Sequence, residues 1–458
     1  MTVKDTSARD IAVLALRDRE GNVSAHLERL LGREAPGSER ALAEELTLGA
    51  VKRRATLEAV LRAFLAEPGR KLPGALNEIL HVALYQLLFL DRIPDFAAVN
   101  EAVEQAGRFH HRRQGGLVNG ILRTVLRALG PLEEGSPPPA QDILQVGPGS
   151  YRRLARAVFA DPAARPEEYL AGAMSLPIEL ARRWVKRCGL ERAAELGLHA
   201  NARPPMTLRP NRLRADRQKL LDELAAAGVP ARPHANGVSV VLDHGVNIAG
   251  LDLFRRGLVQ PQDATATGVC LRAAPPVGGS VLDFCAAPGT KTTHLGELME
   301  NRGSIVAVDV SDDKLQRIVT NAARLGVDIV QTVLADQVAS LPAASFDLVL
   351  ADVPCSNTGV LARRAEARWH FSEQALSQLA RDQRVLIALA ASFVRPGGRL
   401  VYSTCSIEPE ECSQVAAHLP RVNPKLRLAD QELTLPAGAD DAAAWRDGGY
   451  VAVFEARG

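Results

Sequence analysis

Two cysteines of this chain lie in short polar motifs that directly follow apolar stretches. Cys355 belongs to the motif Asp352-Val-Pro-Cys355-Ser356, and Cys405 belongs to Ser403-Thr-Cys405-Ser406. A thiolate is a strong nucleophile, but a free thiol has a pKa of about 8.5 and is ionised to only a few per cent at pH 7. The aspartate, serine and threonine side chains beside these cysteines are groups that could activate them. The two motifs therefore indicate covalent catalysis by a thiol.

A pyrimidine ring is a suitable target for such a thiolate. Addition of the sulfur to carbon 6 makes carbon 5 electron-rich enough to accept a methyl group, while charge develops on ring nitrogen 3. Asp352 is the nearest acid in the sequence, so we expect it to hold the base at nitrogen 3. A base must then remove the proton from carbon 5, and the second thiol is available for this task. On the residues alone, either Cys405 or Cys355 could attack.

Zinc binding and structural burial are the alternatives for these cysteines. The chain has no C-x-x-C pair, and its thiols have no histidine at ligand spacing, so we predict no metal site. For Cys188 and Cys270 we predict buried, structural thiols. Six cysteines without pairing are typical of a reducing cytoplasm.

A loop of small residues follows the apolar run Val281–Phe284. Its sequence is Cys285-Ala286-Ala287-Pro288-Gly289-Thr290-Lys291. A phosphate-binding P-loop needs glycine at both ends and a dinucleotide fingerprint needs three glycines, whereas this loop has only Gly289. Small residues between a strand and a helix let a ligand approach the free amides of the helix N-terminus. The loop therefore predicts a ligand site of a different kind.

Two aspartates follow the next two predicted strands. Asp309 stands 20 residues after Gly289 and ends the run Ile305–Val308, where a carboxylate can accept hydrogen bonds from a ribose. Asp336 follows the third strand, where a polar group can meet an adenine. An adenosine-containing ligand without pyrophosphate fits this pattern, and we predict S-adenosylmethionine. Each acid taken alone could instead cap a helix.

These motifs require a sheet that brings strand ends together. Apolar runs alternate with helical patterns after residue 261, which predicts a C-terminal α/β domain with a doubly wound, mostly parallel sheet. In such a sheet the carboxyl ends of the central strands face the ligand, so both thiols should lie beside the methyl donor. The predicted strands are 280–284, 304–308, 329–334, 346–351, 399–402 and 450–454.

Three further segments precede this domain. Residues 1–130 are predicted to be all helical, residues 131–149 are a proline-rich linker, residues 150–260 form a small α+β subdomain, and residues 261–458 are the catalytic domain. Residues 151–260 hold 18 Lys and Arg against 11 Asp and Glu, although the whole chain carries only +2. This surplus favours contacts with the phosphates of a nucleic acid, with an ordinary solvated surface as the alternative.

Composition excludes several other classes of protein. The 458 residues are 47% hydrophobic and 24% charged, which allows sizeable cores. The apolar stretches are too short to span a bilayer, and residues 1–10 lack the apolar run of a signal peptide. We therefore expect a cytoplasmic protein without membrane contact.

The motifs resemble those of the RNA cytosine carbon-5 methyltransferases. The segment 283–292 is similar to the family's donor loop, 352–355 to its proline-cysteine motif and 403–406 to its nucleophile motif. The segments 77–86, 99–103 and 117–123, with Pro94, resemble the NusB fold, and 206–211 resembles the family's RNA-binding subdomain. The likeness covers nearly the whole chain, and this architecture resembles the bacterial members that act on 16S ribosomal RNA.

The resemblance implies an S-adenosylmethionine-dependent enzyme with defined residue roles. Cys405 would be the nucleophile, Cys355 would assist product release and Asp352 would hold the base. The donor would contact Cys285, Ala286, Ala287, Pro288, Gly289, Thr290, Lys291, Asp309, Asp336 and Asp352. The RNA would contact Arg209, Asn211, Arg212 and Arg364.

Ribosomal RNA is the expected partner, and we expect a monomer. The helical domain could grip RNA, bind a protein or serve as a packing partner. A non-enzymatic RNA-binding assembly factor with a degenerate methyltransferase fold is the alternative to an enzyme.

Overall fold

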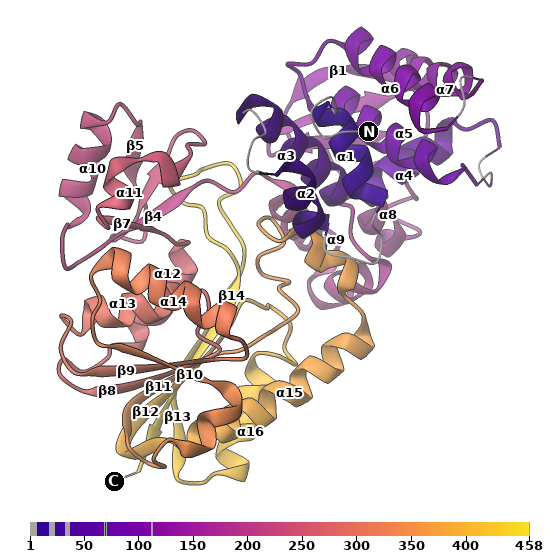
Figure 1. The fold of residues 1–458 in the computed structure, drawn as a ribbon. Coiled ribbons are helices and arrows are strands. Elements are labelled where there is room, and N and C mark those ends of the chain that lie inside the picture. The colour runs from indigo at the N-terminus through magenta and orange to yellow at the C-terminus, as the bar shows by residue number, and fades with distance from the viewer. Residues whose placement is uncertain are drawn as a thin grey trace. The chain divides into compact units, whose positions relative to one another are not determined.

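The computed structural model describes residues 7–17, 23–32, 37–67, 69, 71–110 and 113–457. The chain forms two compact units (Figure 1). The first holds the described residues up to Ala202 together with Arg364–Phe371, and the second holds Arg203–Arg363 and the chain from Ser372 onward. Within the described residues, no helix combines the length and apolar character needed to cross a membrane.

The first unit begins with helices packed around one apolar helix. Helix α5 is apolar on every side, and its residues from Leu76 to Leu84 are almost entirely buried. A helix without a polar face must be surrounded, and α5 contacts α1, α3, α4, α6 and α7. The prediction of a helical N-terminal region is confirmed. Its helices are α1 (Ala8–Arg17), α2 (Val23–Leu31), α3 (Gly37–Lys52), α4 (Arg54–Phe64), α5 (Gly74–Phe89), α6 (Asp95–Phe109) and α7 (Gln114–Ala128).

The predicted linker 131–149 is wrong, because most of it is part of a small antiparallel sheet. Strands β1 (Leu129–Glu134), β2 (Ile143–Gly147) and β3 (Ser150–Leu154) pair in the order β1-β3-β2. The apolar residues of β2 are buried, and the prolines only connect β1 to β2. Helices α8 (Pro166–Ala173) and α9 (Ile178–Asn201) follow in the same unit, so the predicted boundary at residue 150 is also wrong.

A later segment of the chain returns to this first unit. The short helix η4 (Ala365–His370) carries Arg368, whose side chain is fully buried. Its guanidinium donates to the carbonyl oxygens of Lys52, Ser175 and Ala200 and to the side-chain oxygen of Asn201, at 2.8–3.1 Å. These bonds satisfy a buried cation that would otherwise be costly.

The second unit starts with a four-stranded antiparallel sheet in the order β5-β6-β4-β7. Its core is made of apolar residues that include Leu208, Leu220 and Val259. The prediction of a small α+β subdomain is confirmed for this part of the chain. Its elements are β4 (Thr207–Pro210), α10 (Arg217–Ala226), β5 (Ala231–Pro233), β6 (Val240–Leu242), η2 (Ile248–Gly250), α11 (Asp252–Arg255) and β7 (Val259–Pro261).

The larger sheet of this unit has seven strands in the order β10-β9-β8-β11-β12-β14-β13. The first five are parallel, whereas β14 runs antiparallel to both of its neighbours, which confirms the doubly wound, mostly parallel sheet. The strand order reverses between β8 and β11, and ligands bind at such a point. The strands are β8 (Ser280–Phe284), β9 (Ser304–Asp309), β10 (Val330–Leu334), β11 (Phe346–Asp352), β12 (Val394–Thr404), β13 (Leu426–Thr434) and β14 (Gly449–Ala456).

Helices cover both faces of this sheet (Figure 1). One face packs against α12, α13 and α14 through residues such as Leu295 and Ile318, and the other packs against α15 and α16 through residues such as Ile387 and Leu419. The sheet therefore forms the middle layer of three. The remaining helices are α12 (Ala264–Ala273), α13 (Thr290–Leu298), α14 (Asp312–Leu325), η3 (Ala335–Ser340), α15 (Glu373–Ala391) and α16 (Ser413–Val422).

Candidate active site

The two cysteines of the polar motifs meet at the ends of adjacent strands. Strands β11 and β12 pair in parallel with Asp352 opposite Ser403, so the chain after each strand leaves from the same edge of the sheet. Cys355 and Cys405 lie in these connections, and their sulfur atoms are 3.0 Å apart. Both side chains are partly exposed. The strand pairing thus explains why two thiols that are 50 residues apart in the sequence lie side by side.

The Cys405 thiol affects the pKa of Cys355. The hydrogen bond from the Cys405 thiol, with smaller contributions from Thr404 and the Asn357 amide, lowers the pKa of Cys355 overall, although burial and the negative charge of Glu411 both raise it. Cys405 is also within hydrogen-bond distance of the Asn357 side-chain oxygen, at 3.1 Å. Asn357 has a φ of 60°, a left-handed conformation that asparagine tolerates better than most residues. The two sulfur atoms are close enough for a proton to lie between them.

Asp352 is held between two partners at the end of β11. Its carboxylate accepts a hydrogen bond from Lys291 Nζ at 2.6 Å and another from Ser403 Oγ at 2.6 Å. Burial alone would lower the pKa of Lys291, but the charge and hydrogen bond of Asp352 raise it, so the lysine stays charged. Lys291 comes from the small-residue loop, and Ser403 comes from the Cys405 motif. Asp352 thus connects the predicted donor loop to the thiols.

The small-residue loop between β8 and α13 is tightly folded. Gly289 has a φ of 92°, and a Cβ atom there would lie 3.0 Å from the Cα atom of Ile318 in α14. Glycine is therefore required both by the backbone conformation and by the close helix. At the other end, Cys285 has a φ of 59°, although it carries a side chain.

Asp309 anchors this loop from the end of β9. Its carboxylate accepts hydrogen bonds from the amides of Ala287 at 3.0 Å and Val310 at 2.7 Å, and from Lys314 Nζ at 3.0 Å. Burial would raise the pKa of Asp309, but these donors lower it overall. Asp336 lies in η3 just after β10 and is exposed. Asp309 thus ends β9, which neighbours β8, and Asp336 follows β10, the next strand on that side of β8.

Asp283 begins the segment that resembles the donor loop, but no separate role was predicted for it from the sequence. It is fully buried in β8 and accepts a hydrogen bond from Thr292 Oγ1 at 2.6 Å, while its other oxygen has no hydrogen-bond partner among the described residues. Burial raises the pKa of Asp283 to about 7, although the Thr292 bond opposes this. A carboxyl group that is partly protonated at neutral pH thus lies in the strand that leads into the small-residue loop.

We expect Asp283→Asn to change the pH dependence of stability. Because the folded protein binds this proton more tightly than the unfolded chain, the free energy of unfolding of the wild type falls as the pH rises towards about 7, and the fall ends above that pH. The variant lacks this titration, so it should gain roughly 2–3 kcal/mol relative to the wild type between pH 5 and pH 8. Urea unfolding at both pH values measures this. The exposed Asp313→Asn variant is the control, and a gain independent of pH would contradict the prediction.

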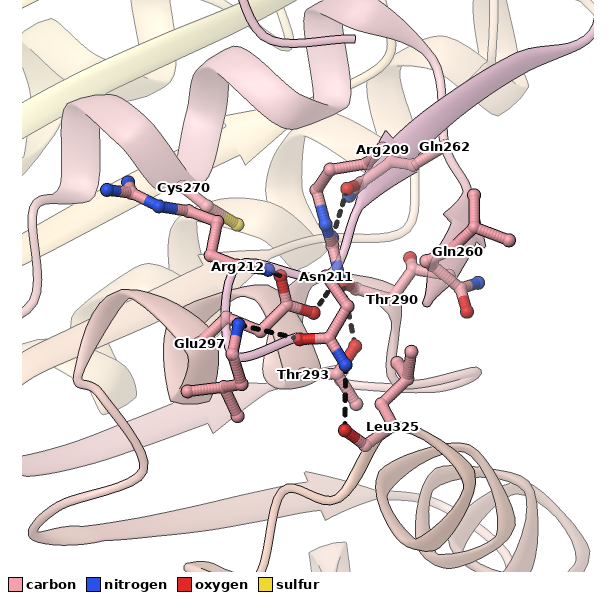
Figure 2. A network of polar contacts seen from close by, with 12 residues as sticks. Arg209, Asn211, Arg212, Gln260, Gln262, Cys270, Thr290, Thr293, Glu297 and Leu325 are labelled. Atoms are coloured by element: carbon pink, nitrogen blue, oxygen red, sulfur yellow. Dashed lines mark hydrogen bonds and ion pairs between the residues drawn. The ribbon is translucent and has the colours of Figure 1, made fainter. Parts of the chain in front are cut away.

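Two of the four predicted RNA contacts are corrected by the structure. Arg209 and Asn211 are fully buried. Arg209 donates to Thr290 O at 3.0 Å, to Glu297 at 2.6 Å and to the side-chain oxygen of Gln262, as Figure 2 shows. Asn211 donates to Leu325 O at 2.8 Å (Figure 2), and it also donates to Gly257 O at 2.8 Å. Both side chains join the small sheet to α13 and α14, and neither is at the surface to touch RNA.

Arg212 and Arg364 are exposed and keep their predicted role as candidates. The guanidinium of Arg212 points away from the buried network (Figure 2), while its backbone amide donates to Glu297 at 3.3 Å. Cys188, predicted to be buried, is exposed, whereas Cys270 is buried as predicted. No group of three or more potential metal-ligating side chains is found in the described part of the chain.

The buried Arg209–Glu297 pair gives a stability prediction. Both side chains have no exposed surface, so Arg209→Met leaves an uncompensated carboxylate in the interior and should lower the free energy of unfolding by about 3–5 kcal/mol. Arg212→Ala, three residues further along, should change stability by less than about 0.5 kcal/mol and weaken RNA binding at low salt. Urea unfolding and filter binding separate the two effects. Equal stability of the two variants would contradict this assignment.

Three family models match the chain. They are described as 16S rRNA methyltransferase RsmB/F for residues 271–444, the NusB family for residues 6–127, and a ferredoxin-like domain of RsmF/B-like methyltransferases for residues 177–249. The three matches follow one another along the chain in the order predicted from the motifs.

Curated relatives are similar over most of their length. The probable ribosomal RNA small subunit methyltransferase B of Bacillus subtilis is 33% identical, with 90% of this chain and 88% of the relative covered. Ribosomal RNA small subunit methyltransferase B of Sodalis glossinidius is 34% identical, with 89% and 87% covered. Among solved structures, PH0851 has a TM-score of 0.73 at 22% identity and 97% coverage of both chains, which shows a shared fold. A methyltransferase homolog protein from Pyrococcus horikoshii has a TM-score of 0.55 at 25% identity, covering 65% of this chain and 100% of that one.

Proposed function

Since this chain belongs to the RsmB/F family of 16S rRNA methyltransferases, we propose that it methylates carbon 5 of a cytosine in 16S ribosomal RNA, with S-adenosyl-L-methionine as donor. The observation that carries the proposal is the pair of sulfur atoms 3.0 Å apart, beside Asp352 and the small-residue loop. A methyltransferase whose substrate atom is already a sufficient nucleophile only has to position that atom beside the methyl group, and it does not need two adjacent thiols. Carbon-5 methylation of a cytosine needs one thiol to attack and a base to finish.

The residues around the donor loop fit an adenosine ligand. Gly289 lets the backbone come close to a ligand, and the Asp309 carboxylate is buried and fixed by two backbone amides. Oxygens held in this way can also accept hydrogen bonds from a ribose, since each has more than one lone pair. Asp336 is exposed where an adenine would need a polar partner. When bound, S-adenosylmethionine would supply an electrophilic methyl group.

The thiols would act in turn on one pyrimidine ring. Cys405 Sγ bonds to carbon 6 and leaves the shared proton on Cys355, which then loses it to solvent. Carbon 5 takes the methyl group, and Cys355 Sγ accepts the proton from carbon 5. The electrons of that C–H bond re-form the ring double bond as the bond from Cys405 to carbon 6 breaks. Asp352, held by Lys291 and Ser403, would take up a proton and donate it to nitrogen 3, where negative charge develops, and this proton would return to Asp352 when the ring double bond re-forms.

The RNA must present its target base outside a stack, which costs a few kcal/mol and least in a loop. The small sheet and its helices carry exposed basic residues that suit phosphate contacts. They include Arg203, Arg212, Arg214, Lys219, Arg232, Arg255 and Arg256.

Methylation of purified 16S ribosomal RNA with radiolabelled S-adenosylmethionine, followed by bisulfite sequencing, tests the proposal. We expect one or a few cytosines to become resistant to bisulfite conversion, and none with an unrelated RNA of equal length. Calorimetry with S-adenosylmethionine alone distinguishes an enzyme from the main alternative. An RNA-binding assembly factor with a degenerate site would bind RNA without binding the donor, and that result would contradict an enzymatic role.

A further inference from the structure

A buried carboxylate lies behind the thiol pair and has no part in the reaction described above. Glu411 lies six residues after Cys405, and its side chain has no exposed surface. Within the described residues, no lysine, arginine or histidine forms an ion pair with it. Burying a carboxylate without a cation is costly unless several donors satisfy it. The groups that donate hydrogen bonds to Glu411 therefore indicate its role.

The donors come from the segment that carries Cys355 and from α15. Glu411 accepts hydrogen bonds from the Ser356 amide at 2.9 Å and from the Ser356 hydroxyl, and from Gln383 Nε2 at 2.9 Å. Gln383 Nε2 also donates to Pro354 O at 2.9 Å. The residues on both sides of Cys355 are thus fixed by the same two side chains.

The same group of side chains reaches the second thiol. Ser356 Oγ lies 3.1 Å from Ser406 Oγ, and Ser406 directly follows Cys405. Tyr402 donates its hydroxyl proton to Glu411 O at 2.6 Å and lies 3.1 Å from the Gln383 side-chain oxygen, which ties the end of β12 to this group. Glu411 therefore contacts the Cys355 segment directly and the Cys405 segment through one serine.

We propose that Glu411 is a positioning residue that holds the two thiols together and, through its negative charge, keeps Cys355 able to accept a proton. This inference rests on the proposed function, in which Cys355 takes the proton from carbon 5. A carboxylate suits the task better than an amide, because all three of its partners are donors. An amide at this position would have to turn an NH₂ group towards one of them.

The charge of Glu411 balances the effect of Cys405. The hydrogen bond from Cys405 lowers the pKa of Cys355, and the nearby carboxylate raises it. In the last step Cys405 is bonded to carbon 6 and no longer donates to Cys355, so the charge of the carboxylate then acts without this opposition and raises the basicity that the step needs. The hydrogen bonds and the charge of Glu411 thus both act on Cys355.

Glu411→Gln in the full-length protein tests this, with the neighbouring Glu410→Gln as the matched control. Alkylation of Cys355 by iodoacetamide, followed by peptide mass spectrometry between pH 5 and pH 10, should show half-maximal reactivity at a pH lower by about one unit in Glu411→Gln. The control should match the wild type. In methylation assays, Glu411→Gln should also accumulate several-fold more covalent RNA adduct than the wild type, because release is slowed.

A second variant keeps the test decisive if Glu411→Gln does not fold. Ser356→Ala removes a contact but leaves the charge, so it should slow turnover without lowering the pH of half-maximal alkylation. An unchanged alkylation profile in Glu411→Gln, or unchanged turnover in Ser356→Ala, would overturn the proposal. Alkylation needs neither RNA nor donor, so a shifted profile in a protein that methylates no RNA would contradict the proposed function and not the role of Glu411.

Discussion

Replacing Cys405 with alanine is expected to lower methyl transfer by at least about a thousandfold, because no bond to carbon 6 can form and carbon 5 stays unactivated. The same variant should form no covalent adduct with RNA. Transfer of a radiolabelled methyl group to 16S ribosomal RNA measures the first effect, and a denaturing gel measures the second. Cys188→Ala is the matched control, since that cysteine is exposed in the first unit and belongs to neither motif.

The opposite result would exchange the roles of the two thiols. If Cys405→Ala kept its activity while Cys355→Ala lost both activity and adduct, Cys355 would be the attacking sulfur. The lowered pKa of Cys355 makes this alternative worth a direct comparison, because a resting thiolate is itself a nucleophile. Assay of both variants in one experiment, at equal folded protein concentration, decides between them.

Cys355→Ala is expected to trap a covalent complex between the protein and its RNA. Cys405 can still attack carbon 6 in this variant, but the base that removes the carbon 5 proton is missing, so the bond to the sulfur is not released. A slower band that contains both protein and RNA should accumulate on a denaturing gel, while the yield of free methylated RNA falls by at least about a hundredfold.

The double variant Cys355→Ala with Cys405→Ala is the control for this second prediction. It should bind RNA without forming the slower band, because the attacking thiol is absent. Normal release of methylated RNA by Cys355→Ala would contradict the base role of Cys355, even if Cys405 proved to be the nucleophile.

The larger sheet and the meeting of the thiols could be predicted from the sequence. The apolar runs that lead to Cys285, Asp309 and Asp352 indicated three of the parallel strands, β8, β9 and β11, and parallel strands bring their carboxyl ends to one edge. The edge strand β13 was missed, because most of its residues are exposed and polar and it lacks the apolar run of a buried strand.

Contacts between distant segments could not be predicted. RNA contacts were predicted for Arg209 and Asn211 because the segment 206–211 resembles the family's RNA-binding subdomain and lies in a basic stretch. The partners that bury them, such as Glu297 and Leu325, are far away in the sequence. A charge pattern shows how many arginines a segment holds and not which of them point inward. Glu411 was missed for the same reason, since its contact with Ser356 spans 55 residues.

The segment 131–149 shows a different limit. Its prolines and its lack of basic residues favoured a linker, yet Ile143 and Leu144 are buried in a short strand. Three-stranded antiparallel sheets need few residues, and the apolar signal of such short strands is weak beside the strong signal of consecutive prolines.

The central claim is that Cys405 and Cys355 act one after the other on the same pyrimidine ring. Incubation of the wild-type protein and S-adenosylmethionine with 16S ribosomal RNA that contains 5-fluorocytidine tests it most directly, because a fluorine at carbon 5 cannot leave as a proton does. The account predicts a stable complex whose peptide mass spectrum places the methylated nucleotide on Cys405, with Cys355 unmodified. A nucleotide attached to Cys355, or methylated RNA released without any complex, would contradict it.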